Sequence, residues 1–301
     1  MLGGIIHRVS VAVTARRVLL ALAMSEELER AVYALPGGER GAYRLARRHV
    51  AGTRSQDALA CAHRLAAVGL ASSIDFFGEN VSDPVEADRV TDHYVALAGT
   101  LEQAPGNTFL SIDLSHIGLD QPGEAVQQRL ERIASALPTG GRVQVGAEQE
   151  RRADRILTAV LAVARRGGAV SATVQANLER SRADAEALAE GGVPIRLVKG
   201  AYVEEPRVAR PWGEPTDLAF LELAHELRAG GAEVAIATHD AILREALLRA
   251  LPGIGVEMLL GVRSADANVL AGRGVPVRIY VPYGDGWFRY AMRRWAESVG
   301  R

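Results

Sequence analysis

The chain has 301 residues, of which 48% are hydrophobic and 24% are charged, and it carries a net charge of -1. This composition is typical of a globular protein with room for one large domain or two modest ones, and the balanced charge argues against a nucleic-acid partner. The single cysteine, Cys61, excludes an internal disulfide framework and favours a reducing compartment. It lies in the helix-like run DALACAHRLAAVGL, which predicts a small core residue.

The N-terminal segment contains an apolar run, VSVAVTARRVLLALAM, which Arg16 and Arg17 interrupt and the acidic SEELE follows. The run is too broken to span a bilayer, and no small-residue cleavage site follows an uninterrupted apolar core. We therefore predict an amphipathic helix, not a signal peptide, in a protein that stays in the cytoplasm.

Eight short runs rich in Val, Ile and Phe follow, each succeeded by a longer segment with helical periodicity. They are SSIDFFG (72–78), TFLSIDLS (108–115), RVQVGA (142–147), AVSATVQA (169–176), PIRLVKG (194–200), EVAIATH (233–239), GVEMLLG (255–261) and PVRIYVPYG (276–284). Eight such units, with strands predicted to be apolar on both faces, indicate the α/β class and a closed parallel (β/α)8 barrel of the TIM type over residues 71–301. Residues 1–70 are predicted to form a helical lead-in to this single domain. The sequence contains neither a G-x-G-x-x-G turn after a strand nor a G-K-[ST] motif, so Rossmann and P-loop nucleotide sites lack support.

Polar residues gather at the predicted carboxyl ends of these strands, where barrel enzymes carry their chemistry. The candidates are Glu79, Asp113, Ser115, His116, Glu148, Gln175, Lys199, Tyr202, Thr238, His239, Asp240, Tyr280 and Tyr283. One histidine and one aspartate in THD, without a second spaced partner, are a weak zinc signal, so we predict hydrogen bonding to a ligand and no metal. Lys199 has two interpretations: it forms a Schiff base or meets the anionic edge of a cofactor, or it pairs with a carboxylate of a neighbouring strand.

The last predicted strand and its helix read RIYVPYGDGWFRYAMRRWAE (278–297). In a helix that begins after Gly286, Tyr290, Arg293 and Arg294 share one face. Two guanidiniums beside a phenol can bind a carboxylate bidentately. The alternative is a solvated arginine pair on an amphipathic terminal helix, but the position after the eighth strand favours the carboxylate clamp. Glu79 ends the first predicted strand, which neighbours the eighth, and is expected to pair with this clamp.

Several stretches together resemble the proline dehydrogenase family, which are flavoenzymes built on a distorted (β/α)8 barrel. The segment ARRHVAGTRSQDALACAHRLAAVGLASSIDFFGENVSDPVEAD is similar to the family's lead-in helix and first strand. RLVKGAY (196–202), ATHD (237–240), MLLGV (258–262) and RIYVPYGDGWFRYAMRR (278–294) are similar to its core motifs. The resemblance extends over nearly the whole chain, and the motifs are specific when taken together.

The resemblance implies an FAD-dependent oxidoreductase that oxidises L-proline, or a related cyclic imino acid or amine, by hydride transfer to flavin N5. Proline would give Δ1-pyrroline-5-carboxylate. By position, Arg293 and Arg294 would hold the substrate carboxylate with support from Glu79, and Tyr202, Leu259, Tyr280 and Tyr290 would wall the ring. The flavin would meet Gln175, Arg196, Val198, Lys199, Gly200, Ala201, Thr238, His239 and Asp240. The implied electron acceptor is a quinone, with peripheral contact at the inner face of the membrane, although the sequence shows no basic amphipathic anchor.

Three positions depart from the usual family pattern. Asp113 stands where a lysine usually lies beside the substrate, Gly146 where an aspartate lies near the flavin, and Asn177 where a tyrosine follows Gln175. An aspartate in place of a lysine near a bound carboxylate exchanges attraction for repulsion, worth several kcal/mol at an effective dielectric constant of about 20.

Several interpretations therefore stay open. In the first, the substrate is a modified cyclic amine of specialised metabolism, and Asp113 contacts its extra amino or hydroxyl group. In the second, the protein holds flavin but has little turnover of proline. A hypothesis of another class is a flavin-free lyase in which Lys199 forms a Schiff base. A barrel that only binds a ligand is the third class.

Overall fold

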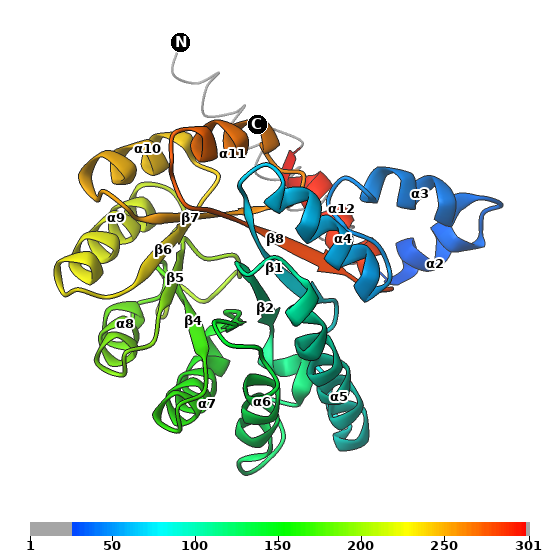
Figure 1. Ribbon diagram of the computed structural model, residues 1–301, viewed down its shortest axis with the longest axis horizontal. Helices are drawn as coiled ribbons and strands as arrows, with labels where there is room; N and C mark the ends of the chain where they lie inside the picture. The colour runs from blue at the N-terminus through cyan, green and yellow to red at the C-terminus, as the bar shows by residue number, and fades with distance from the viewer. Residues whose placement is uncertain (1–25, 299–301) are drawn as a thin grey trace.

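The computed structural model describes residues 26–298, and its eight strands form one closed parallel barrel in chain order (Figure 1). The strands are β1 (Ala71–Phe76), β2 (Thr108–Ile112), β3 (Val143–Val145), β4 (Val170–Gln175), β5 (Ile195–Val198), β6 (Val234–Ala237), β7 (Gly255–Leu259) and β8 (Val277–Tyr283). The parallel pairing of β1 with β8, in which Ser73 lies opposite Tyr280, closes the barrel. The predicted fold class and all eight predicted strands are confirmed, although each strand ends earlier than its apolar run suggested. The predicted N-terminal amphipathic helix lies outside the described residues.

Helices α5 to α11 form a ring around this barrel (Figure 1). The described helices are α2 (Glu26–Ala34), α3 (Gly38–Ala46), α4 (Ser55–Ala66), α5 (Pro84–Thr100), α6 (Ala125–Ser135), α7 (Ala153–Arg165), α8 (Ser181–Glu190), α9 (Glu214–Ala229), α10 (Ala241–Ala250), α11 (Ser264–Gly272) and α12 (Trp287–Ser298). Local signals fix several of the helix starts. Asp83 accepts a hydrogen bond from the N–H of Val85 and precedes Pro84, so α5 begins with a capped first turn.

The barrel is distorted where β8 meets β1. Helix α4 packs against both of these strands, and its Ala58, Cys61 and Ala62 belong to the main apolar core. Helix α12 follows β8 but packs on α3, where Trp287 and Phe288 join a second, smaller apolar cluster. A lead-in helix therefore covers β8 and β1, which leaves α12 available for another position, and Cys61 is confirmed as a core residue.

The prediction that the strands are apolar on both faces is wrong, because the barrel buries a polar network. Gln144 of β3 and Arg196 of β5 both donate to the hydroxyl of Thr173, at 3.2 and 3.0 Å. Arg196 also pairs with Glu257 of β7 at 3.5 Å, across the strand β6 that separates them in the sheet. Buried polar groups are tolerated when they are hydrogen-bonded, and these partners come from strands far apart in the sequence.

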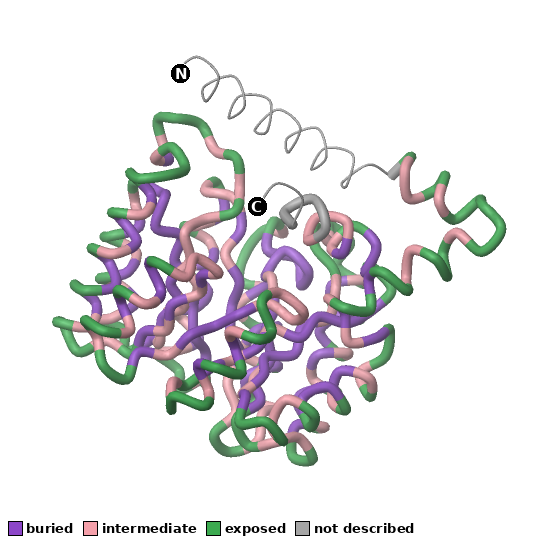
Figure 2. The backbone as a smooth tube through the Cα atoms, turned by 90° about the horizontal axis from the view of Figure 1, so that it is seen from above, coloured by how far each residue is buried: buried purple, intermediate pink, exposed green. Residues whose placement is uncertain are grey.

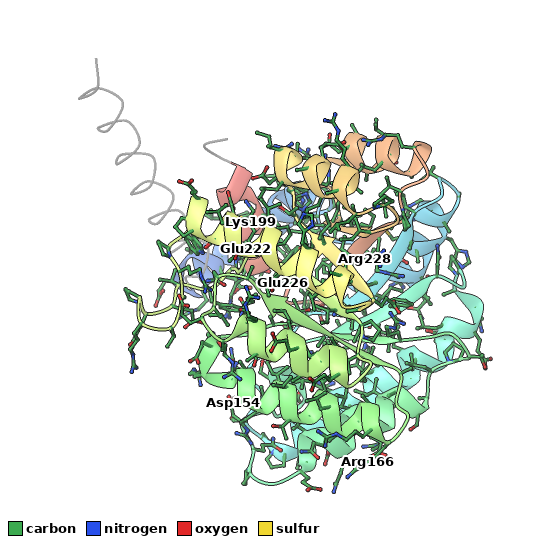
Figure 3. The ribbon with its side chains drawn as sticks, turned by 90° about the vertical axis from the view of Figure 1, so that its left-hand side faces the viewer. Asp154, Arg166, Lys199, Glu222, Glu226 and Arg228 are labelled. Carbon is green, nitrogen blue, oxygen red and sulfur yellow. The ribbon has the colours of Figure 1, made fainter. Side chains whose placement is uncertain are left out.

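The two ends of the barrel are distinct in the side view. Figure 3 shows Lys199 and Asp154 at the end where α9 and α7 begin, and Arg166 and Arg228 at the opposite end. The first of these is the end where the strands finish, so it collects the candidate residues. Buried segments run through the centre of the molecule, whereas α2 and α3 extend away from it (Figure 2). None of the helices among residues 26–298 is long and apolar enough to cross a membrane.

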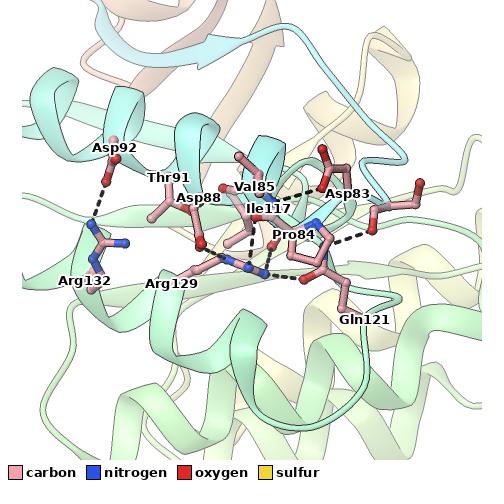
Figure 4. Close-up of polar contacts among 12 residues, drawn as sticks. Asp83, Pro84, Val85, Asp88, Thr91, Asp92, Ile117, Gln121, Arg129 and Arg132 are labelled. Atoms are coloured by element: carbon pink, nitrogen blue, oxygen red, sulfur yellow. Dashed lines mark hydrogen bonds and ion pairs between the residues drawn. The ribbon is translucent and has the colours of Figure 1, made fainter.

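Arg129 fastens α6 to α5 and to the segment after β2 (Figure 4). Its side chain is buried, and its Nε donates to Asp88 at 2.7 Å. Its Nη1 donates to the carbonyl of Ile117 at 3.1 Å and to Gln121 at 2.7 Å. One buried guanidinium therefore satisfies acceptors from three segments.

We expect Arg129→Met to lower the free energy of unfolding by about 2–4 kcal/mol, because several charge-assisted hydrogen bonds are lost and a buried carbonyl loses its donor. Arg132→Met is the matched control, since it breaks the exposed ion pair with Asp92 on the same two helices and costs less than about 1 kcal/mol. Urea denaturation of both variants measures the difference, and equal losses would contradict it.

Candidate active site

Helix α12 extends over the carboxyl ends of the strands. The ring of Tyr290 lies 6.2 Å from the ring of Tyr280 of β8, and 5.1 Å from that of Phe77, which follows β1. Arg293 donates at 3.4 Å to the carbonyl of Ala201, which follows β5 on the other side of the barrel. Contacts on both sides show that this helix crosses the mouth of the barrel. The guanidinium of Arg294 lies 5.3 Å from the centre of the Tyr290 ring.

The lead-in helices hold α12 in this position. The ring of Trp287 lies 5.1 Å from that of Tyr43, and the ring of Phe288 lies 5.6 Å from that of Tyr33. Arg289 donates to Glu29 at 3.0 Å. Aromatic pairs of this kind contribute beyond the apolar area that they bury, so α2 and α3 position the arginine-bearing helix.

The sequence suggested that Glu79 ends the first strand, and this prediction is wrong. The strand ends at Phe76, and Glu79 is an exposed residue of the loop that follows. The residue at the carboxyl end of β1 that faces the polar network is Asp75. Support of the arginine pair by Glu79 stays a prediction.

Asp75 is a buried site residue that the sequence analysis missed. Its carboxylate accepts hydrogen bonds from the phenols of Tyr94 at 3.1 Å and Tyr280 at 2.5 Å. Burial raises the pKa of Asp75 to about 6, although the two phenols act to lower it. The signal in the sequence was an aspartate inside the otherwise uncharged run SSIDFFG.

The raised pKa of Asp75 makes the stability depend on pH. Between its unfolded value of about 3.9 and its folded value of about 6, the folded state binds more protons, so the stability contributed by this group falls as pH rises. We expect Asp75→Asn to flatten the fall of the unfolding free energy between about pH 4 and pH 6. Denaturation across this range measures the slope, with the exposed Asp92→Asn as control. Equal slopes in both variants would show that Asp75 is not responsible.

Asp113 and Gly146 form a contact between the ends of β2 and β3. A Cβ atom on Gly146 would overlap the Oδ1 atom of Asp113, so the carboxylate uses the space that any side chain at 146 would need. Asp113 is half-buried, and burial followed by the negative charges of Asp75 and Glu148 raises its pKa well above the ordinary range.

Glu148, which follows β3, is held from three directions. Its carboxylate accepts from the N–H of Ser115 at 2.9 Å and from Arg152 at 2.6 Å. Gln175, at the end of β4, donates to its backbone carbonyl at 2.8 Å. Gln175 is thus buried and already engaged by its own chain.

Lys199 forms ion pairs with Asp217 of α9 at 2.6 Å and with Asp240 at 3.0 Å. Asp240 follows β6, so the interpretation of an ion pair with a neighbouring strand's carboxylate is the one observed. Asp240 also caps α10 by accepting from the N–H groups of Ile242 and Leu243 at 3.1 and 3.2 Å. Burial acts to raise the pKa of Asp240, but the hydrogen bond from Lys199 and the two backbone N–H groups hold this pKa below its usual value. Asp217 was not among the predicted residues.

The other residues of ATHD connect β6 to β7. The Thr238 hydroxyl accepts from the N–H of Asp240 at 3.1 Å, and His239 Nε2 accepts from the N–H of Leu259 at 3.3 Å. This places Leu259, a predicted wall of the substrate site, beside His239. No group of three or more residues suited to a metal ion occurs within residues 26–298.

The backbone at the end of β5 packs closely against the residues that follow β4. Gly200 has a φ of 120°, and a Cβ atom there would overlap the side-chain oxygen of Asn177. That oxygen is buried and accepts no hydrogen bond from the described residues. Buried acceptors normally receive a hydrogen bond, so the oxygen of Asn177 favours a bound group that brings its own donor. The neighbouring backbone at Gly200 has a conformation that suits only glycine.

Residues 58–299 match the family model described as proline dehydrogenase. The chain belongs to the proline dehydrogenase family. It is 33% identical over 260 residues to proline dehydrogenase 1 of Bacillus subtilis (strain 168), covering 84% of this chain and 86% of that protein. It is 31% identical over 269 residues to the proline dehydrogenase of Deinococcus radiodurans, covering 85% and 87%.

Solved structures agree with the fold of the proline dehydrogenase family. Proline utilization A from Bdellovibrio bacteriovorus superposes with a TM-score of 0.79 at 19% identity, over 96% of this chain and 36% of that one. The protein of the same name from Corynebacterium freiburgense gives 0.71 at 18% identity, over 94% and 33%. This chain spans about a third of those longer chains, and at such identities the likeness concerns the fold alone.

The three departures from the usual proline dehydrogenase pattern fall into two spatial contacts. Asp113 packs against Gly146, and Asn177 packs against Gly200. Any side chain at position 146, including the usual aspartate, would collide with Asp113 as it lies here, so Asp113 and Gly146 are compatible with each other.

Proposed function

We propose that this protein is an FAD-dependent dehydrogenase that oxidises L-proline to Δ1-pyrroline-5-carboxylate. The observation that carries the proposal is the placement of α12 over the barrel mouth, with Arg293 reaching Ala201 beyond β5. Membership of the proline dehydrogenase family supports it.

In this proposal the substrate carboxylate binds to Arg293 and Arg294. Guanidiniums suit this role because their rigid donor fork matches a carboxylate. Tyr290 of this helix lies next to Tyr280 of β8, so the two rings can cover the apolar part of a small ring. The remaining walls are Tyr202 and Leu259, with Asp113 facing the same space and Glu79 supporting the arginines. A water-poor, oriented site favours transfer of hydride from the carbon beside the ring nitrogen.

The residues present fit a flavin at the ends of β4, β5 and β6. When bound, FAD supplies the hydride acceptor at N5. Gly200 and Ala201 provide a backbone that a flat ring can approach, and the orphaned oxygen of Asn177 provides an acceptor beside it. Lys199 can exchange one of its two carboxylate partners for an anionic group of the cofactor. The full proposed set is Gln175, Arg196, Val198, Lys199, Gly200, Ala201, Thr238, His239 and Asp240.

Visible absorption of the purified protein tests the cofactor before any substrate is chosen. A flavin spectrum that bleaches when L-proline is added without oxygen is the expected result. A flavin spectrum that no cyclic amino acid or amine bleaches would contradict the proposed reaction. Bleaching by a hydroxylated or aminated analogue in preference to proline would instead support the modified-substrate interpretation.

The flavin-free lyase is disfavoured by the surroundings of Lys199. The amine of Lys199 is already engaged by two carboxylates, at 2.6 and 3.0 Å, whereas a Schiff-base lysine needs a nitrogen that is free to attack a carbonyl. Colourless protein that borohydride traps with a carbonyl substrate would reverse this choice.

For the electron acceptor we propose a quinone, reached at the cytoplasmic face of a membrane. Val203 and Trp212 support this, because both are exposed apolar side chains on the loop that follows β5 at the barrel mouth. Reduction of a soluble quinone by the proline-reduced protein, and sedimentation with anionic lipid vesicles, test the two parts separately.

A further inference from the structure

Asp113 differs from the other carboxylates near the strand ends. Asp75 accepts hydrogen bonds from two phenols, and Glu148 is held by a backbone N–H and an arginine. The carboxylate of Asp113 accepts no hydrogen bond from any residue between 26 and 298. Asp113 is half-buried, and its carboxylate occupies the space that a side chain at Gly146 would fill. A partly buried carboxylate without donors is unfavourable, so a ligand that brings a donor gains from binding there.

Tyr202 directly follows Ala201, whose carbonyl accepts a hydrogen bond from Arg293 at 3.4 Å. Burial, and next the negative charges of Asp113 and Glu148, raise the pKa of its phenol, while the positive charge of Arg293 opposes them. The phenol of Tyr202 is therefore influenced by charges of both signs. A small zwitterion over this tyrosine can direct its carboxylate to the arginine and its ammonium to the aspartate. This orientation also removes the repulsion that Asp113 would exert on a carboxylate placed next to it.

We propose that Asp113 binds the ring ammonium of the cyclic amino acid and accepts its proton before the neighbouring carbon–hydrogen bond breaks. This assignment rests on the proposed function. One N–H bond of the ammonium breaks, the proton goes to a carboxylate oxygen of Asp113, and the nitrogen keeps the electron pair. That pair forms the C=N bond when hydride leaves the adjacent carbon for the flavin, so the amino acid is oxidised by two electrons and the flavin is reduced by two.

The neutral amine is the reactive form, because a protonated nitrogen has no free pair with which to form the C=N bond. A positioned base of this kind contributes about 100-fold or more to a rate. Asp75 is less suited, because its two oxygens already accept hydrogen bonds from Tyr94 and Tyr280.

The pH dependence follows from the groups that face Asp113. The charged groups are Asp75 of β1, Glu79 of the following loop, Glu148 after β3 and Arg196 of β5, and the phenols are those of Tyr94, Tyr202 and Tyr280. Burial and the three carboxylates raise the pKa of Asp113, whereas Arg196 acts against them. Because the base has to be ionised, flavin reduction should fall as pH falls through this raised pKa. The negative charge of Asp75 also raises the pKa of Asp113, so a variant is needed to assign the fall in rate at low pH to one of the two carboxylates.

The test compares two measurements on the holoenzyme that should move in opposite directions. In Asp113→Asn, anaerobic reduction of the flavin by L-proline should slow by about 100-fold or more. The rate of this reduction should also no longer fall as the pH is lowered. Tetrahydrofuran-2-carboxylate has an ether oxygen where proline has its ammonium and cannot be deprotonated there. It should bind Asp113→Asn about 10-fold more tightly than the parent protein, because the amide can donate to the ether oxygen. Cyclopentanecarboxylate, which has no polar ring atom, should bind both proteins alike.

The result that overturns the assignment is an Asp113→Asn protein that reduces its flavin at the parent rate with the same low-pH limb. Parallel weakening of all three ligands would also overturn it, since that pattern indicates general damage to the site. Asp92→Asn, the same exchange on the exposed face of α5, is the control and should leave every measurement unchanged. If the parent protein holds no flavin, or its flavin is not reduced by proline, the proposed function itself fails. If the parent turns over normally and only the Asp113→Asn contrast is absent, the function stands and the assignment of the base is wrong.

Discussion

Gly200→Ala is expected to lose the flavin and to lower the free energy of unfolding by about 2–4 kcal/mol. Gly200 has a φ of 120°, a conformation that residues with a side chain rarely adopt. The added methyl group would also overlap the side-chain oxygen of Asn177, which is buried and cannot move into solvent. Relief of either strain shifts the backbone at the end of β5, where the proposed flavin contacts lie.

Gly192→Ala is the matched control for Gly200→Ala. Gly192 also has a positive φ, of 67°, but nothing lies within 4 Å of an added Cβ atom. Its replacement should cost only the left-handed backbone conformation, about 1 kcal/mol, and leave the flavin content unchanged. Flavin absorbance per mole of protein and urea denaturation measure both effects. Equal losses of stability in the two variants, with full flavin content in both, would show that the contact with Asn177 is unimportant.

The barrel could be predicted from the sequence because each strand is short, apolar and followed by a helical segment. The position of the last helix on the end of β8 follows from the same regularity, which is why Tyr290 and Arg293 were predicted to face a ligand. That α4 rather than α12 covers β8 and β1 did not follow, because both segments are amphipathic and the choice depends on packing against α3.

The polar partners within the site were harder to predict than the residues themselves. Lys199 was identified at a strand end, but its pairing with Asp217 depends on how the first turn of α9 packs beside β5. Asp75 was missed because it was treated as part of an apolar run, whereas alternation along β1 places it with the polar network. Hydrogen-bond partners that come from different strands have no fixed spacing in the sequence, so only the fold could assign them.

Arg293→Met and Arg294→Met are each expected to raise the KM for L-proline by about 100-fold, with a smaller effect on the maximal rate of flavin reduction. A charge-assisted, bidentate hydrogen bond to a carboxylate is worth about 1.5–3 kcal/mol, and a factor of 100 corresponds to about 2.7 kcal/mol. Methionine keeps the unbranched apolar stem of the side chain and a similar helix propensity, so the packing of α12 should survive. Arg289→Met on the same helix is the control, because Arg289 pairs with Glu29 of the lead-in and not with the barrel mouth.

Loss of affinity alone would not show that the arginines bind the carboxylate, because damage to α12 would have the same effect. Prolinamide separates the two explanations, since it keeps the ring and its amine but has no carboxylate charge. If the arginines bind the carboxylate, the parent protein should prefer proline to prolinamide and each methionine variant should lose most of that preference, with prolinamide little affected. If the variants weaken both compounds equally, the arginines act through the structure of α12. The solvated arginine pair would then be the correct interpretation of this helix.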